Sequence, residues 1–310
     1  SPFMLKMSLN VMITNSVRMN YERELERAIA VDKFRQSDIA KNIQVHYPQF
    51  SAISDPAFLC LRDDEGKLIE ESAVLFRHNP FIETGNNVSC LAALCHDNVL
   101  SQGNRFDSLI MSISQKYSLS KQQSAELWLD KFLHTCIEPL LWMFSHYGIA
   151  LEAHQQNLLV KLDAEGLPIH GYYRDSQGYY ISEDAMLRYP EHEEIFSTFA
   201  SGTTEFVNHH FSYYLIGNSL LGVINALSQS QGVNEQALIN NVQDKFKSWQ
   251  QKWHDAAYDY LGFLLTHSTL PYKDNLTTRL CDLDELTAPL AQQSIYSELH
   301  NPFYTSRIGN

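Results

Sequence analysis

Polar side chains between residues 152 and 175 have the types and spacing that nucleotide and metal chemistry needs. Glu152, His154, Gln156 and Asn157 come first, and the pair Arg174-Asp175 follows at the end of the next strand-like run. Two carboxylates, an imidazole, two amides and a guanidinium within about twenty-five residues are groups that hold a magnesium nucleotide. The cluster therefore predicts a nucleotide site with Mg²⁺.

The spacing of this cluster favours binding over a structural role. Glu152, His154 and Gln156 follow an i, i+2, i+4 pattern, so their side chains would share one face of a strand. Strands under long helices seldom point three polar groups the same way. Magnesium usually takes one or two carboxylates plus phosphate oxygens; Asp175 adds a second carboxylate, and Asn157 could offer an amide oxygen.

Two other segments carry groups suited to phosphate, each with a plainer alternative. Ser16 and Arg18 lie two apart, so on an extended chain both could donate to one anion, or they could form a turn with a surface arginine. Lys273 stands in a proline-marked break, where it could reach a phosphate or be a surface lysine. The adjacent His209-His210 would face different directions on a helix, so we interpret them as core-edge histidines.

A β-hairpin must position the central cluster. Alternating runs at 158–162 and 169–173 flank a turn at 163–166, with the cluster at the entrance and the charged pair at the exit. Periodicity predicts other strands at 4–14, 57–62 and 72–76, the last two as a second hairpin. Helices are expected at 22–34, 108–117, 121–147 (N-capped near Ser120), 191–225, 234–265 and 284–297.

The order of these elements predicts an α+β fold in two parts. Residues 1–100 would form a small antiparallel β-containing part, and residues 101–310 a mainly helical domain that carries the hairpin near 152–182. The apolar fraction of 44% is ordinary for a globular protein, and no apolar run approaches the length of a membrane span.

Charge and cysteine usage narrow the class of protein. The net charge of −13 is spread along the chain, which argues against a nucleic-acid partner or an anionic membrane surface. The five cysteines are scattered without a C-x-x-C pair, which favours reduced thiols in a cytoplasmic protein over a zinc or iron–sulfur site. No signal peptide is visible, and a start in strand-like sequence without an initiator methionine predicts a piece of a longer protein.

Five segments together resemble one known family. They are MLKMSLNVMITNSVR at 4–18, RELERAIAV at 23–31, GIALEAHQQNLLV at 148–160, YYRDSQGYY at 172–180 and LPYKDNLTTRL at 270–280. In order and spacing they are similar to the siderophore synthetases that work without a peptide-synthesis template, the IucA/IucC-like family. EAHQQN followed by RD-x-x-G is the most specific match. The resemblance covers this whole chain but only the later part of the fingers and the palm of such enzymes, which are about twice as long and commonly dimeric.

The resemblance implies an activity. Members of the family use ATP and Mg²⁺ to activate a carboxylate, often of citrate, as an acyl-adenylate with loss of pyrophosphate. An amine or hydroxyl then attacks to give an amide or ester. The carboxylate is already a nucleophile, so the first step needs positive charge around the phosphates and no strong base. In the second step His154 could take a proton from the amine if its pKa lies near neutral.

The matched motifs carry residue roles with them. From the fingers side Ser16 and Arg18 would hold ATP phosphates, and Lys273 would close on the phosphates or on the substrate carboxylate. Arg27 and Arg77 are further candidate contacts for phosphate or carboxylate. With His154, the residues Arg18 and Lys273 make up the predicted catalytic set.

The palm motif supplies the other predicted groups. His154, Gln156 and Asn157 would line the nucleotide site together with Asp175. Glu152, Asn157 and Asp175 would be the metal-facing set.

Three alternatives stay open. A kinase-like phosphotransferase also uses an H-x-x-N pattern, but it needs an aspartate where Gln155-Gln156 stand, and a glycine-rich loop. A ferric-siderophore reductase has a related palm but needs clustered cysteines, and Cys281 stands alone. A third possibility, which we expect for these residues in isolation, is a nucleotide-binding piece without turnover.

Overall fold

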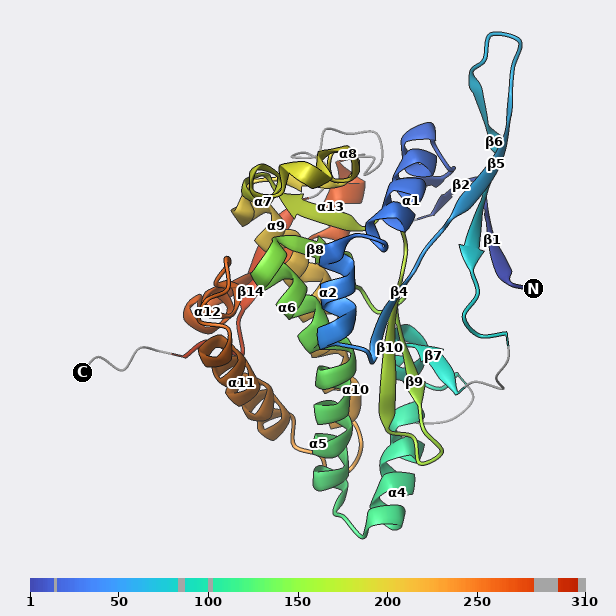
Figure 1. The fold of residues 1–310 in the computed structure, drawn as a ribbon. Helices are drawn as coiled ribbons and strands as arrows, with labels where there is room; N and C mark the ends of the chain where they lie inside the picture. Colours follow the sequence, from blue (N-terminus) through green and yellow to red (C-terminus); the bar gives the residue numbers. More distant parts are fainter. Residues whose placement is uncertain (14–15, 83–86, 100–102, 282–294, 306–310) are drawn as a thin grey trace.

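The computed structural model describes residues 1–13, 16–82, 87–99, 103–281 and 295–305. Helices and several small sheets alternate along the chain, which confirms the α+β prediction. In Figure 1 a helical body occupies the left and centre, and a long β-hairpin projects away from it beside the N-terminus. No helix among the described residues is both long and apolar enough to cross a membrane.

The N-terminal strands form two sheets where one strand was predicted. The expected strand at 4–14 is divided into β1 (Phe3–Met7), which pairs with β6, and β2 (Leu9–Ile13), which pairs with β3 (Ser16–Arg18). Ser8 causes the break, because its N–H donates to the Ala73 carbonyl and its hydroxyl accepts from the Asn20 N–H at 3.0 Å. Side-chain hydrogen bonding of this kind competes with strand pairing.

The second predicted hairpin is confirmed and is longer than expected. β5 (Ala57–Arg62) and β6 (Leu68–His78) pair antiparallel, and β1 adds to the other edge of β6. One face of this sheet packs on α1 (Glu22–Phe34), whose bounds match the prediction. The other face leaves apolar side chains exposed, among them Leu5, Met7 and Leu59. An uncovered apolar sheet face is typical of a docking surface.

The hairpin predicted around residues 158–173 lies in the sheet at the centre of Figure 1. β9 (Leu158–Leu162) and β10 (Pro168–Arg174) pair antiparallel, and the Asp163 carboxylate closes the turn by accepting from the backbone N–H groups of Glu165 and Leu167. β4 (Phe50–Ile53) and β7 (Val88–Cys90) complete the order β4-β10-β9-β7. Strands from both predicted parts therefore share one sheet; the domain division at residue 100 stays a prediction.

The helix predicted at 121–147 is one helical run with a π segment inside it. It consists of α5 (Lys121–Phe132), η1 (Leu133–Ile137) and α6 (Glu138–Tyr147), and Ser120 caps it as predicted. Its apolar residues are almost completely buried in the main core. Two short helices, α2 (Asp38–His46) and α3 (Leu91–Cys95), precede α4 (Arg105–Tyr117), which packs along α5.

Two helices predicted as continuous are interrupted in the structure. The stretch 191–225 is broken by β12 (Ala200–Gly202), which pairs parallel with β11 (Tyr179–Ser182). Strand pairing from a distant segment overrides helix propensity there. The helical pieces around it are η2 (Pro190–His192), α8 (Glu193–Phe196), α9 (Thr204–Phe211), the π-helix η3 (Ser212–Leu220) and α10 (Leu221–Ser228).

The stretch 234–265 is likewise two helices, α11 (Glu235–Lys252) and α12 (Tyr260–Thr266). Asp259 starts the second by accepting from the Gly262 N–H at 2.8 Å. The predicted helix at 284–297 lies mostly outside the described residues, and its last two positions begin β14 (Tyr296–His300). β14 pairs with β13 (Thr269–Lys273); the remaining elements are β8 (Ile149–Leu151), α7 (Glu183–Arg188) and α13 (Asn275–Leu280).

Candidate functional site

The predicted cluster lies on a loop, which corrects one expectation. β8 ends at Leu151 and β9 begins at Leu158, so residues 152–157 form a turn and do not share a strand face. The carbonyl of His154 accepts from the N–H groups of Asn157 and Leu158, which closes the turn. An i, i+2, i+4 pattern cannot reveal such a turn, because its hydrogen bonds depend on where the flanking strands pair.

The turn still brings three of the predicted groups together around His154. Glu152 Oε1 lies 3.6 Å from Nε2 of the imidazole, and Asn157 Nδ2 lies 3.3 Å from the same nitrogen. Burial lowers the pKa of His154 below its ordinary value, although the negative charge of Asp175 acts in the opposite direction. His154 is therefore neutral at pH 7.

Asp175 lies where the N-terminal strands meet the hairpin. Its carboxylate is 3.6 Å from Lys6 Nζ and 3.8 Å from an Arg77 nitrogen, and it accepts from the Gln177 N–H. Burial acts to raise the pKa of Asp175, but Lys6 and Arg77 outweigh it, so the pKa is lowered and the group is ionised at neutral pH. Its φ of 121° is a strained value for a residue with a side chain, and such strain is common at functional sites.

Arg77, a candidate phosphate contact, is bound to a buried carboxylate. Its Nε and Nη2 donate to the two oxygens of Asp55 at 2.7 and 3.0 Å, and the Ser176 hydroxyl donates to the same carboxylate. Asp55 is fully buried and the Arg77 side chain is only 13% exposed. This ion pair joins β6 to the residues after β4, and the Ser176 hydroxyl attaches it to the residues after β10, so its evident role in this structure is to hold these segments together.

Lys273 and Tyr214 form the opposite wall of the site. Lys273 ends β13 with only 6% of its surface exposed, and its Nζ lies 5.8 Å from the centre of the Tyr214 ring. The same ring lies 5.9 Å from the His154 imidazole. The structure thus brings Lys273 and His154 to one aromatic side chain. Tyr214 was not among the predicted site residues, since an aromatic side chain on a helix does not show what its ring faces.

The fingers-side residues are connected to this cluster through β1. Arg18 is exposed and its Nη2 donates to the Ile13 carbonyl across the β2–β3 hairpin; the side chain of Ser16 is outside the described set. Asn20, just beyond β3, donates its amide to the carbonyls of Lys6 and Ala73. Because the Asn20 amide binds the Lys6 carbonyl and Lys6 pairs with Asp175, these contacts connect the predicted phosphate-binding strand β3 to Asp175.

Two other predicted residues, Gln156 and Arg27, form hydrogen bonds with neighbouring segments. Gln156 is exposed, and its carbonyl accepts both Nε and Nη2 of Arg174 at 3.1 and 2.9 Å, which ties the turn to the end of β10. Arg27 donates from Nη1 to the Gln177 carbonyl at 3.0 Å and from Nε to the Thr198 carbonyl. Nucleotide contacts by Gln156 and Arg27 stay predictions.

The donor set suits Mg²⁺ only when phosphate completes it. No group of three His, Cys, Asp or Glu residues lies close enough to hold a metal in the described part of the chain. Glu152 and Asp175 both act on the same imidazole, and Asn157 directs its amide nitrogen to the Glu152 carbonyl. Two carboxylates are what magnesium takes when phosphate oxygens and water supply its other ligands.

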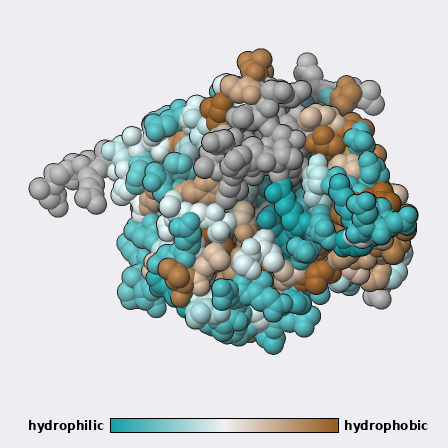
Figure 2. Space-filling model, turned by 90° about the horizontal axis from the view of Figure 1, so that it is seen from above, coloured by the Kyte–Doolittle hydropathy of each residue, from teal (hydrophilic) through white to brown (hydrophobic). Residues whose placement is uncertain are grey.

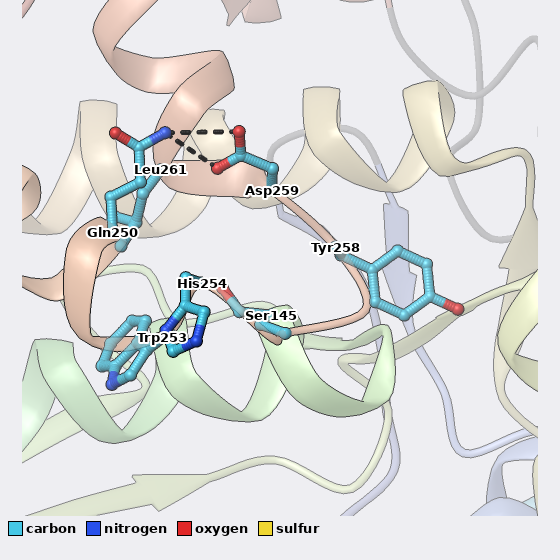
Figure 3. A pocket seen from close by; sticks show the side chains of 8 residues that line it. Ser145, Gln250, Trp253, His254, Tyr258, Asp259 and Leu261 are labelled. Atoms are coloured by element: carbon cyan, nitrogen blue, oxygen red, sulfur yellow. Dashed lines mark hydrogen bonds between the residues drawn. The ribbon is translucent and has the colours of Figure 1, made fainter.

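Two cavities lie apart from this cluster. One, of about 290 Å³, opens beside the connection between α11 and α12, where Trp253, His254 and Tyr258 line it and Gln250 bonds to Asp259 (Figure 3). The other, of about 550 Å³, lies between α5, η1 and the turn of the central hairpin. Neither is lined by a predicted site residue, so the assignment of the site rests on its chemistry.

Gly178→Ala is expected to displace Glu152 and Tyr173 and so to destabilise the fold. A Cβ at Gly178 would lie 2.5 Å from both the Glu152 Cβ and the Tyr173 hydroxyl. We expect a loss of about 1–3 kcal/mol in the free energy of unfolding, because overpacking forces such groups to move. Urea unfolding measures it, with Gly217→Ala as the control, since a Cβ there meets nothing closer than 3.6 Å. An unchanged midpoint for Gly178→Ala would contradict the prediction.

Comparison with known proteins assigns the class. The IucA / IucC family model matches residues 1–96, and the model of the ferric iron reductase FhuF-like transporter matches residues 126–288. The rhizobactin siderophore biosynthesis protein RhbC of Rhizobium meliloti is 35% identical over 97% of this chain and 52% of its own length. The spermidine-citrate ligase of Bacillus anthracis is 31% identical, over 97% and 49%.

A solved structure agrees with the sequence matches. The ATP-bound aerobactin synthetase IucA of Klebsiella pneumoniae superposes with a TM-score of 0.87 at 26% identity, covering 99% of this chain and 53% of that one. Fold and relatives thus agree with the family predicted from the motifs. The chain belongs to the IucA/IucC family. It spans about half the length of the curated relatives it matches.

Proposed function

We propose that this chain is the ATP-binding part of a siderophore synthetase that adenylates a citrate-like carboxylate and condenses it with an amine or hydroxyl. The observation that carries the proposal is the convergence of Glu152, Asn157 and the charge of Asp175 on a neutral, partly buried His154. The similarity to an ATP-bound synthetase supports the choice of ATP over other nucleotides. The relatives are named as synthetases and ligases, which does not favour a kinase.

Positive charge is the main requirement of the first step. A carboxylate that attacks the α-phosphate brings two anions together, so cationic donors must compensate. Lys273 would supply one point charge from the β13 side, and Arg18 another from the β2–β3 hairpin. Lys6 and Arg77 already face Asp175 in the structure, so their charge is partly used within the protein.

Mg²⁺ would be held by Glu152, Asp175 and the amide oxygen of Asn157. When bound, the ion would neutralise phosphate charge. Asp175 is suited to this because its lowered pKa keeps it ionised at neutral pH.

The second step needs a proton acceptor, which His154 can be. Its lowered pKa leaves the imidazole neutral at pH 7, so it can accept a proton from an attacking amine. In this structure the Asn157 amide N–H faces Nε2, and an attacking amine would displace this contact when Nε2 takes up its proton. Gln156 would line the nucleotide beside it.

The substrates follow from the relatives. A citrate-like acceptor and an amine or hydroxyl nucleophile are proposed, since one relative is named as a spermidine-citrate ligase and another as an L-2,3-diaminopropanoate–citrate ligase of Staphylococcus aureus. A homodimer and a cytoplasmic location stay predictions.

The face drawn in Figure 2 is mostly hydrophilic with separate hydrophobic groups, several on the side where Figure 1 places β5 and β6.

Product analysis tests the proposal. With ATP, citrate and a panel of amines, any turnover is expected to give AMP and pyrophosphate; a kinase would give ADP. Calorimetric titration of ATP tests binding independently of turnover, so a chain that binds without catalysing is also recognised. ADP as the nucleotide product, or failure to bind ATP at millimolar concentration, would reject the proposal.

Lys273→Met is expected to weaken ATP binding by about tenfold or more, because a charge-assisted contact to phosphate contributes on the order of 1.5–3 kcal/mol. Methionine keeps the apolar stem and removes the charge. Lys245→Met is the matched control, since Lys245 pairs with Asp130 on the outer helices. Equal ATP affinity in both variants would remove Lys273 from the site.

A further inference from the structure

The backbone on both sides of His154 is attached to the end of the π-helix η3. Ser219 Oγ donates to the Ala153 carbonyl at 2.6 Å. The Gln155 N–H donates to Asn218 Oδ1 at 2.9 Å, and Gln155 Nε2 donates to the Asn218 carbonyl, also at 2.9 Å. Three hydrogen bonds from two neighbouring residues therefore fix the segment that carries the imidazole. Ala153 and Ser219 are completely buried, so no water competes for that bond.

The surrounding helices leave room for this attachment. A Cβ at Gly222 of α10 would overlap the Gln155 side-chain amide, so the glycine provides the space that the amide occupies. On the other side of the loop the Ala92 N–H of α3 donates to the Gln155 carbonyl at 3.2 Å. The side chain and carbonyl of Gln155 are thus held from two helices, although the residue itself was not among the predicted site groups.

The same π-helix carries the aromatic wall of the site. In a π-helix the hydrogen bonds run from i to i+5, so residues four or five apart lie on one side. Tyr214, Asn218 and Ser219 have this spacing, and all three face the 152–157 loop or its imidazole. Because Tyr214 also lies beside Lys273, one rigid segment sets the position of His154 relative to Lys273.

We propose that Asn218 and Ser219, acting through Gln155 and Ala153, are positioning residues that hold His154 in place for the reaction. They do not touch substrate. Their effect is on the orientation and burial of the imidazole between Glu152 and Tyr214. The inference rests on the proposed function for its catalytic meaning; the structural attachment can be measured without turnover.

Asn218→Leu is the first test, because leucine is similar in size and cannot accept the Gln155 N–H. The readout is the NMR signal of the His154 imidazole at a fixed pH of about 8, assigned by its loss in His154→Gln. The Tyr214 ring lies 5.9 Å from this imidazole and Glu152 Oε1 lies 3.6 Å from its Nε2, so the chemical shift reports the position of the imidazole. A loosened loop moves the imidazole relative to both groups, so we expect its signal to shift and broaden. With turnover, kcat should fall about tenfold or more with a smaller change in the KM for ATP.

Gly222→Ala is the second variant and avoids the question of folding. Alanine in a helix normally stabilises relative to glycine, and the Cβ at Gly222 would meet only the movable end of the Gln155 side chain, so we expect the fold to be retained. Our inference predicts a displaced Gln155 and a shifted NMR signal of the His154 imidazole in a protein that remains folded. Asn225→Leu is the control, since Asn225 is an exposed residue of the same helix α10.

The outcomes distinguish the positioning role from the proposed function. A His154 signal unchanged in both Asn218→Leu and Gly222→Ala, or shifted equally in Asn225→Leu, would overturn the positioning role. A shifted signal together with no ATP binding by any variant or by the unsubstituted chain would leave the positioning intact and reject the proposed function.

Discussion

His154→Ala is expected to reduce amide formation from citrate and an amine by about 10²- to 10⁴-fold, the usual contribution of a general base. The imidazole is the group on which Glu152, Asn157 and Tyr214 converge. Pyrophosphate release and mass spectrometry of the product measure the loss. His254→Ala, at the cavity in Figure 3, is the matched control.

The same residue predicts the acid limb of the pH profile. Because burial lowers the pKa of His154, the neutral form persists below the ordinary value of about 6.5. As pH falls through the lowered pKa the imidazole takes up a proton and can no longer accept one from the amine. Activity should therefore be flat around neutral pH and decline only at a pH below 6.5. Wild-type rates in His154→Ala, or an acid limb that persists unchanged in that variant, would contradict the assignment.

Arg77→Ala is expected to destabilise the fold by about 3–5 kcal/mol, because it would leave a buried carboxylate without its cation. Asp55 is fully buried and receives both guanidinium bonds as well as the Ser176 hydroxyl. Removal of Arg77 also takes away one of the two cations near Asp175, so the pKa of that carboxylate should rise. Urea unfolding measures the free energy.

An exposed arginine provides the comparison. Arg62 on β5 pairs with Glu22 at 2.6 Å at the surface, so Arg62→Ala should leave the unfolding midpoint nearly unchanged. If Arg77→Ala behaved like Arg62→Ala while ATP binding was lost, Arg77 would be a phosphate contact, as first considered, and not a structural ion pair. The double variant with Asp55→Asn should recover part of the stability, because the buried charge is then absent.

Acid unfolding follows from the lowered pKa of Asp175. A carboxylate with a folded-state pKa below its unfolded value contributes stability above about pH 4, and the contribution disappears as pH falls through the folded pKa. Asp175→Asn should remove that pH-dependent part and is preferable to Asp175→Ala, since asparagine tolerates the positive φ of 121° better than alanine. Urea midpoints of both proteins between pH 2 and pH 5 measure the difference, and parallel profiles would contradict it.

Local signals were enough for several elements. Helix α1 begins where Glu24 can cap it, and the turn after β9 closes through the Asp163 side chain. Ser120 starts α5 in the same way. In each case the interacting residues are four or fewer positions apart, so the chain needs no distant partner to form them. The motif with Glu152, His154 and Asn157 is equally local, and the family that it and the other segments predicted for the chain was confirmed.

Other features depended on segments far apart in the chain. The helix predicted at 191–225 is interrupted because Ala200–Gly202 pairs with β11. The cations that face Asp175 come from β1 and β6, more than ninety positions earlier, and the ring beside His154 comes from η3. No periodicity in the sequence encodes these contacts, since they arise only when strands and helices pack.

The sequence by itself determined the family and the kinds of group at the site. The tertiary structure decided which residues face these groups. His154 is a partly buried imidazole with a lowered pKa, and its loop is attached to η3 through Gln155 and Asn218. Burial and charge pairing set the protonation of a side chain, and both are properties of the packed molecule.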